Sequence, residues 1–276
     1  KLNTILVAVN VTGLAVGAAS TVGVAQRAFS VGLAAGWYNG AWSIGAIVMG
    51  LLAAGKLRSM KVSTIPEFFE FYYDTKGRAI AAIGLVIIMC VITALQYMAG
   101  GAILSSLLPE IFSFHGGMIM SAVVFIGITL IGGLWSSGLA NIVSVTLIYI
   151  GIIYSAIQSW DAVLSKLPNP EVMGSPVAGL AFATILGWII VMITQTITAQ
   201  GPVQIACGAK NAKAARNGYV LAGLMIFPVG FICAVLGVVC KAMYPEMPVA
   251  QAALAMPKVV MTLDPLAGGV TLAALW

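Results

Sequence analysis

The chain has 276 residues, of which 61% are hydrophobic and only 8% are charged, and its formal net charge is +5. A soluble domain carries about 25% charged residues, and a large helical core would still need charged outer faces. The composition therefore excludes a soluble domain and predicts an all-α membrane protein, a polytopic helical bundle in a lipid bilayer with no nucleic-acid partner. Six windows hold no Asp, Glu, Lys or Arg and are each long enough for a span of about 20 residues: 2–26, 28–55, 79–109, 116–160, 172–209 and 217–240.

In chain order, these windows predict about eight spans. The window 116–160 must hold two of them, because one helix of that length would extend about 68 Å at 1.5 Å per residue. Gly132-Gly133 to Gly138 is the natural break inside it. Lys1 runs directly into an apolar stretch much longer than the core of a signal peptide, so we expect no cleavable signal. The spans are expected near 3–25, 31–55, 79–107, 117–133, 138–159, 178–207, 217–240 and from 262 onward.

Three longer connections carry their own structural signals. Thr64-Ile65-Pro66-Glu67 has the spacing of a capping box with an early proline. Aromatic residues follow at positions 68, 69, 71, 72 and 73, so we expect a short helix that lies in the membrane interface. The segments 160–177 and 241–261 are rich in proline and charge and should lie outside the membrane.

The distribution of Lys and Arg predicts the orientation, because cytoplasmic loops carry an excess of both. With eight spans, alternate loops fall on the same side of the membrane, and one side collects nine basic residues against four on the other. The richer side should be cytoplasmic, with the N-terminus of this chain, and the protein should be a multi-pass protein of the cell membrane. The nine are Lys1, Lys56, Arg58, Lys61, Lys76, Arg78, Lys210, Lys213 and Arg216, and the four are Arg27, Lys166, Lys241 and Lys258.

Two spans have unusual residues near their centres. The first is rich in Gly and small polar residues between Asn10 and Gly23, and the sixth has five polar side chains in the seven residues Thr194 to Gln200, followed by Gly201-Pro202. Broken backbone is tolerated in lipid only where protein or a water-filled cavity satisfies it, and many transporters bind solute and ion at such breaks. Small-residue packing in the first span and polar contacts between helices in the sixth remain open alternatives.

The sequence contains no catalytic constellation. The only histidine, His115, lies in a short loop, and the four cysteines show neither metal-ligand spacing nor a disulfide framework. We therefore expect neither an enzyme nor a bound cofactor or metal centre, and transport is the class that remains. The cysteines are expected to be buried packing residues: Cys90, Cys207, Cys233 and Cys240.

Five segments together resemble the sodium:solute symporter family, which includes sugar, proline and pantothenate symporters. Each segment alone is a weak signal, but their order and spacing extend over most of the chain. They are Gly23 to Leu33 with Phe29 ahead of Gly32-Leu33, Ser63 to Phe69 with its TIPEF element, Gly132-Gly133-Leu134-Trp135, Gln200 to Gln204 with Ala209 to Gly218, and Ala252-Ala253-Leu254 with Met256-Pro257.

The resemblance implies the leucine-transporter-type fold of five plus five inverted helices. Residues 1–159 would form the first repeat, with core helices one to five, and residues 178–276 would form a partial second repeat, with core helices six and seven and the start of eight. Only 11 residues follow Pro265, which is too short for a span. We therefore expect a fold that is incomplete at the C-terminus and a sequence that is part of a longer protein.

Family position also implies residues for a site. Sodium would bind the backbone carbonyls of Gly13 and Val16, and Asn141 would lie near it. Family members often carry Thr-Asp where this chain has Ala140-Asn141, so a negative charge near the ion is missing here. The solute would touch core helices one, two and six, and Thr198 is added because of its place in the polar stretch. The expected solute residues are Ser20, Asn39, Trp42, Met192, Gln195 and Thr198.

The sequence thus predicts a secondary active symporter that imports a small polar organic solute with sodium by alternating access. The solute class stays open among sugars, amino acids and carboxylates. Two alternatives also stay open: a proton-coupled or facilitative transporter of the same fold, and a transporter-like domain that acts as a sensor. The lack of any carboxylate in the core windows argues against a simple proton relay.

Overall fold

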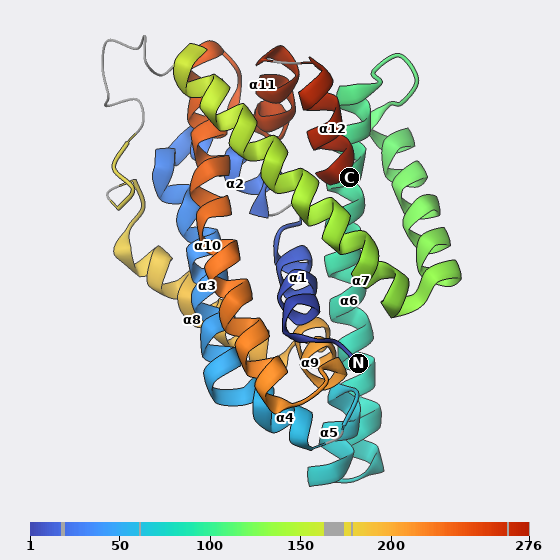
Figure 1. Ribbon diagram of the computed structural model, residues 1–276. Coiled ribbons are helices and arrows are strands. Elements are labelled where there is room, and N and C mark those ends of the chain that lie inside the picture. The colour runs from blue at the N-terminus through green and yellow to red at the C-terminus, as the bar shows by residue number, and fades with distance from the viewer. Residues whose placement is uncertain (18–19, 61, 163–173, 178, 264, 276) are drawn as a thin grey trace.

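The computed structural model describes residues 1–17, 20–60, 62–162, 174–177, 179–263 and 265–275, and within them the chain is helical (Figure 1). The one β-type contact among these residues is a parallel bridge between Leu2 and Ala209. The elements in chain order are α1 (Thr4–Ala15), α2 (Val22–Val31), the 3₁₀ helix η2 (Gly32–Gly36), α3 (Trp37–Met49), the π-helix η3 (Gly50–Ala54), α4 (Gly55–Ser59), α5 (Ile65–Tyr72), α6 (Thr75–Leu107), α7 (Phe114–Ala162), α8 (Phe182–Thr198), α9 (Gln200–Gly208), α10 (Ala212–Met243), the 3₁₀ helix η6 (Val249–Leu254), α11 (Ala255–Leu263) and α12 (Pro265–Leu275).

Each of the eight expected spans corresponds to helix in the described residues, but two of the spans are interrupted. The first stops after Ala15, and the sixth is divided into α8 and α9, whose axes differ by 51°. Among the described residues, four helices are long and apolar enough to cross a membrane, or five if α8 and α9 are one span. Helix α1 and the start of α7 are shorter apolar helices. The four are Val22–Ser59, which runs from α2 through α4, Thr75–Leu107 (α6), Asn141–Trp160 within α7, and Ala212–Met243 (α10).

In helix α7 the break expected between the fourth and fifth spans is a change of direction within one helix (Figure 1). The residues of the predicted break, 132–138, belong to helix, and α7 has 49 residues. Figure 1 shows its two arms running in different directions, one at the edge of the bundle and one crossing in front of α6. A helical backbone keeps its own hydrogen bonds, whereas a loop would leave peptide groups unpaired in lipid. The side chains of 131–140 lie outside the described residues.

Helix α10 is the central packing element, and glycines spaced by seven let three other segments approach its backbone. A Cβ at Gly223 would lie 2.8 Å from the carbonyl oxygen of Ser43 in α3, and one at Gly237 would lie 2.2 Å from that of Ala25 in α2. A Cβ at Gly230 would lie 2.5 Å from the carbonyl oxygen of Gly36. Such contacts favour association because van der Waals packing, rather than water exclusion, drives helix pairing in lipid.

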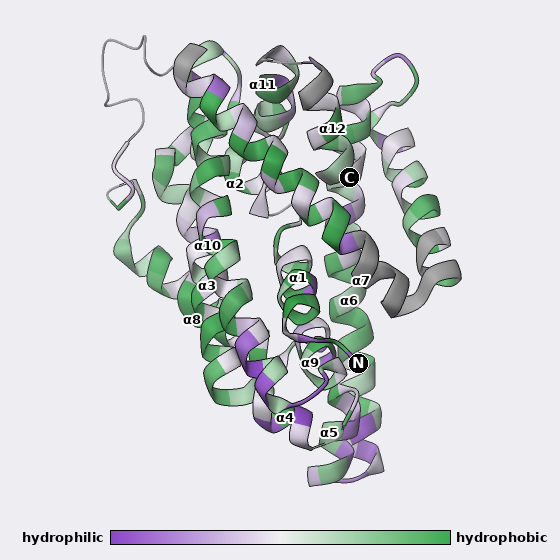
Figure 2. Cartoon of the chain, in the orientation of Figure 1, coloured by the Kyte–Doolittle hydropathy of each residue, from purple (hydrophilic) through white to green (hydrophobic). Residues whose placement is uncertain are grey.

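Polar residues gather at one end of the bundle, where α4, α5 and the start of α10 lie (Figure 2). The segments that carry most of the Lys and Arg residues of the predicted cytoplasmic side lie at this end. The loop after α10 lies at the opposite end (Figure 1). Helix α6 is apolar and its most apolar stretch has no buried residue. Cys90 is exposed on that helix, so the prediction of buried cysteines is wrong for it, whereas Cys233 and Cys240 are buried in α10.

Candidate ion and solute site

The first candidate region is the end of α1, where the helix stops inside an apolar stretch. Val16 leaves the helical conformation, with φ −87° and ψ 56°, and its N–H donates to the carbonyl of Thr12 at 2.7 Å. Gly17 follows, and Gly is about 1 kcal/mol less favourable than Ala in a helix. No N–H of the described residues donates to the carbonyl of Gly13 or Val16. These two carbonyls are the predicted sodium ligands.

Hydroxyl groups satisfy part of the backbone at this break. The Ser20 hydroxyl donates to the carbonyl of Ala15, and the Thr21 hydroxyl donates to that of Gly17 at 3.0 Å. Ser20 is 1% exposed. The Ser20 hydroxyl thus bridges the interruption between α1 and α2, and its role as a solute contact stays a prediction.

The structure brings Asn141 of α7 directly onto Gly13 of α1. A Cβ at Gly13 would lie 3.0 Å from Asn141 Cγ and 3.3 Å from Asn141 Oδ1. The Asn141 amide donates to Asn10 Oδ1 at 3.4 Å, and the Asn10 amide donates to the carbonyl of Leu6 at 2.7 Å. A neutral amide oxygen therefore lies beside the carbonyl end of α1, where an acidic residue would have added a negative charge.

The sixth span breaks one residue before Gln200. Ala199 is extended, with φ −82° and ψ 145°. Pro202 explains this position, because proline has no N–H to donate and its ring would clash with the carbonyl four residues earlier, that of Thr198. The predicted kink is thus present, and it falls two residues ahead of Gly201-Pro202. Leu14 Cδ2 would lie 3.1 Å from a Cβ at Gly201, so the two breaks adjoin.

The polar residues of the sixth span divide into two kinds. Thr196 is fully buried and its hydroxyl lies 3.0 Å from the carbonyl of Gly45 in α3 and 2.9 Å from that of Met192. Thr198 is exposed and its hydroxyl donates to the carbonyl of Thr194 at 2.8 Å. Gln195 is partly buried. Polar contacts between helices therefore account for Thr196, and Gln195 and Thr198 stay predicted solute residues.

The other three predicted solute residues lie in the packed interior. Trp42 and Met192 belong to the buried core, with exposed fractions of 7% and 4%. Asn39 is fully buried, and its Cβ would lie 2.6 Å from a Cβ at Gly230 of α10. Neither the nitrogen nor the oxygen of the Asn39 amide has a hydrogen-bond partner among the described residues. Asn39 thus faces α10, and its role as a solute residue stays a prediction, as do those of Trp42 and Met192.

Two residues near the breaks were not found from the sequence. Gln96 of α6 lies beside the first break, with its amide atoms 3.6 and 3.7 Å from a Cβ at Gly17. The signal was present, because Gln96 is a polar residue inside an apolar window. Gly45 is the second: a Cβ there would lie 2.6 Å from the Met192 carbonyl oxygen, so the glycine lets α8 approach α3.

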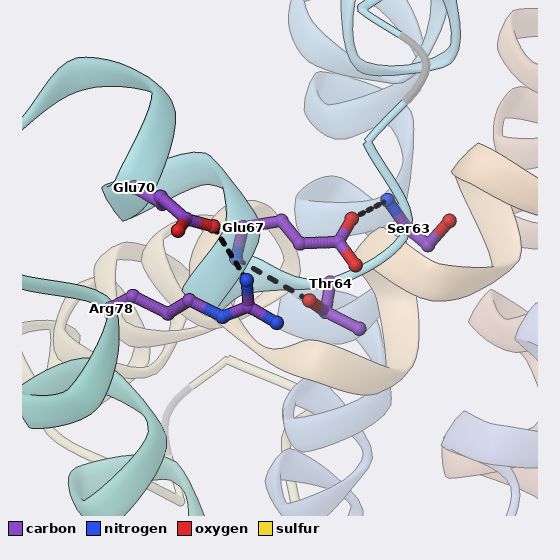
Figure 3. A network of polar contacts seen from close by, with 5 residues as sticks. All are labelled: Ser63, Thr64, Glu67, Glu70 and Arg78. Carbon is purple, nitrogen blue, oxygen red and sulfur yellow. Dashed lines mark hydrogen bonds and ion pairs between the residues drawn. The ribbon is translucent and has the colours of Figure 1, made fainter. Parts of the chain in front are cut away.

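Helix α5 has the predicted Thr64 cap, with the Glu67 side chain bonded one residue ahead of the N-cap, and it connects to the sixth span. The Glu67 N–H donates to the Thr64 hydroxyl at 3.4 Å, and Glu67 Oε2 accepts from the Ser63 N–H at 2.7 Å (Figure 3). In the same view, Arg78 of α6 forms an ion pair with Glu70 of α5 at 2.6 Å. The Ile65 N–H donates to Gln200 Oε1 at 3.0 Å, which ties the start of α5 to the start of α9.

An all-helical bundle with two adjoining interrupted helices is the architecture of a helical membrane transporter. The sequence profile of the sodium:solute symporter family matches residues 1–274, and the chain belongs to this family, which comprises transporters rather than enzymes. A search of curated protein sequences gives no match.

A solved structure shows the same fold. It is that of a Na⁺-coupled sialic acid symporter in a substrate-bound, outward-open state, with a TM-score of 0.71 and 13% sequence identity. The likeness covers 100% of this chain and 63% of the symporter chain, so the chain spans less than two thirds of that protein. The leucine-transporter-type fold expected from the family resemblance is confirmed.

Proposed function

We propose that the chain is the ion- and solute-binding part of a secondary active symporter in the cell membrane. It imports a small polar organic solute, a sugar, amino acid or carboxylate, together with sodium by alternating access. The observation that carries the proposal is the adjoining pair of interrupted helices, α1 with α2 and α8 with α9. Family membership and the fold of the Na⁺-coupled sialic acid symporter support it.

Sodium is the proposed coupling ion because it is a hard cation that favours oxygen ligands. The carbonyls of Gly13 and Val16 supply such oxygens at the end of α1, and Asn141 adds a neutral amide oxygen beside Gly13. The C-terminal end of a helix also carries a partial negative charge, which favours a cation there.

The domain boundaries and the orientation are part of the proposal. Residues 1–159 form the first inverted repeat and residues 178–276 form part of the second, so α1 and α8 occupy equivalent places. The end of the bundle that holds α4 and α5 is cytoplasmic, together with the N-terminus, because most of the Lys and Arg residues lie in the segments at that end.

The test is solute uptake by the full-length protein reconstituted in liposomes. Labelled sugars, amino acids and small carboxylates are supplied with an inward sodium gradient, with a proton gradient, or with neither. Accumulation of a solute only with sodium supports symport with sodium. Equal accumulation with the proton gradient, or equilibration without any gradient, would establish the proton-coupled or the facilitative alternative instead.

Within that assay, Gln195→Ala should raise the solute concentration for half-maximal uptake and leave thermal stability nearly unchanged. The reason is that hydrogen bonds between helices in membranes average only about 0.6 kcal/mol. If the variant unfolds in detergent while its remaining uptake keeps the original affinity, Gln195 is a packing residue.

A further inference from the structure

A cavity with a mixed polar and apolar lining lies at the opposite end of the bundle from α5, outside the region of the two breaks. It has a volume of about 510 Å³ and lies between the end of α6, the residue after α10, and α11. We call it the α11 pocket. Its size falls within the range of about 300–1,000 Å³ typical of small-molecule sites. Its polar lining residues are Ser105, Ser106, Tyr244, Lys258 and Thr262.

Lys258 is the charged group of the α11 pocket, and it forms no ion pair with any acidic side chain of the described residues. Its ammonium lies 3.8 Å from Met247 Sδ and 5.9 Å from the centre of the Tyr244 ring. The ion pair found among the described residues is the one at the other end of the molecule, between Arg78 and Glu70. Glu246 lines an adjoining cavity with Lys258 but forms no ion pair with it.

Lys258 is partly buried and forms no ion pair among the described residues. Withdrawing a charge from water is unfavourable unless the charge is paired. The thioether and the ring that surround Lys258 cannot neutralise it. An anion that enters from solution can do so, and a carboxylate accepts charge-assisted hydrogen bonds from an ammonium.

The hydroxyl groups of the α11 pocket define the rest of the ligand. Ser106 donates to the carbonyl of Ala102 at 2.7 Å, and Thr262 donates to that of Lys258 at 2.6 Å. A hydroxyl has one proton and two lone pairs, so these oxygens, with their protons in use, are left as acceptors. The Tyr244 hydroxyl is 3.5 Å from Thr262 Oγ1, a weak contact that leaves its proton available.

We propose that the α11 pocket binds a small organic acid that also carries hydroxyl or amino groups. The carboxylate binds Lys258 and the Tyr244 hydroxyl, and the donors of the solute bind the oxygens of Ser106 and Thr262. This inference rests on the proposed transport function. In that function, the α11 pocket holds an acidic solute at the extracellular end of the bundle before the solute reaches the two breaks. The proposal narrows the solute class to carboxylates.

The test measures the pocket without transport. The full chain in lipid nanodiscs, with no gradient, is treated with an amine-reactive reagent, and modification of each lysine is followed by mass spectrometry. Three acid and neutral pairs serve as probes: galacturonate with galactose, glutamate with glutamine, and lactate with glycerol. Lys241 is the matched control, because it lies at the same end but over the Phe29 ring at 4.7 Å and does not line the α11 pocket.

At least one acid should slow the modification of Lys258, while its neutral partner and the rate at Lys241 show no change. Tyr244→Phe should raise the half-protecting concentration by about fivefold, the loss expected for one hydrogen bond of about 1 kcal/mol. Protection by no acid, or equal protection by acid and neutral probe, overturns the inference. Protection without sodium-driven uptake would contradict symport but not the pocket, and uptake without protection would contradict only the pocket.

Discussion

The two interrupted spans are broken by different means, and the difference separates their roles. Helix α1 ends at Ala15 and α2 begins at Val22, and the carbonyls of Gly13 and Val16 lack N–H partners among the described residues. Between α8 and α9 the break is a single extended residue ahead of Pro202. The first break exposes backbone oxygens, as an ion site requires, whereas the second bends the helix and keeps its polar groups on side chains.

The helices at the two breaks are also held by different contacts. Helix α8 contacts α3 closely at Gly45 and hydrogen-bonds it through Thr196. At the first break, the hydroxyls of Ser20 and Thr21 bond to carbonyls within residues 15–17. Contact with another helix comes from the Asn141 amide, which donates to Asn10 Oδ1 at 3.4 Å. Such an arrangement suits a site whose backbone has to exchange partners when an ion binds.

The largest expected effect comes from forcing α8 away from α3. Gly45→Leu would place its side chain against the Met192 carbonyl, where a Cβ alone would be 2.6 Å from the oxygen. Overpacking of this kind typically destabilises by about 1–3 kcal/mol. Gly187→Leu is the control, because a Cβ at Gly187 has nothing within 4 Å. Equal melting temperatures of the two variants in detergent would contradict the close contact of α3 and α8.

A smaller loss should follow from removing the hydrogen bond between those helices. Thr196→Val keeps the shape of the side chain but removes the bond to the Gly45 carbonyl, which should cost about 0.6–1.7 kcal/mol. Thr198→Val is the matched control, since that hydroxyl bonds only within its own helix and is exposed. Denaturation of both variants in the same detergent checks the difference in stability. A larger loss of stability for Thr198→Val would contradict the assignment of Thr196 as the residue that bonds another helix.

Ser20→Ala should have the smallest effect on stability. The Ala15 carbonyl loses one donor, and a typical net contribution is about 0.5–1.5 kcal/mol. If Ser20 only bridges the break, the variant should weaken sodium dependence of uptake and leave solute affinity alone. A large rise in the solute concentration for half-maximal uptake, at unchanged sodium dependence, would support Ser20 as a solute contact.

The sequence predicts the fold well because membrane helices are specified locally. Charge-free windows of sufficient length mark the spans, and the capping box at Thr64 and Glu67 marks α5. Family position predicts the contact of Gly13 with Asn141 only indirectly, and the structure places them together. The sequence alone could not show that Thr196 bonds another helix while Thr198 bonds its own, since both look alike in a run of polar residues.

The orientation of Asn39 was equally beyond sequence reasoning. A helix position fixes which face a residue lies on, but only the packed bundle shows which neighbour that face meets. Gly230 on α10 leaves room at that point, and Asn39 fills it. Gln96 was missed for the opposite reason: a single polar residue in an apolar helix gains its meaning only when the break at Gly17 lies beside it.

The central claim is that the end of α1 binds sodium, and binding of radioactive ²²Na⁺ to the purified full chain tests it most directly. Wild type should show saturable binding. Gly13→Leu should lose it, because even a Cβ at Gly13 would lie 3.0 Å from Asn141 Cγ. Asn141→Asp should tighten it, because a negative charge near a cation stabilises the bound state. Saturable binding that neither substitution changes would place the ion elsewhere and contradict this account.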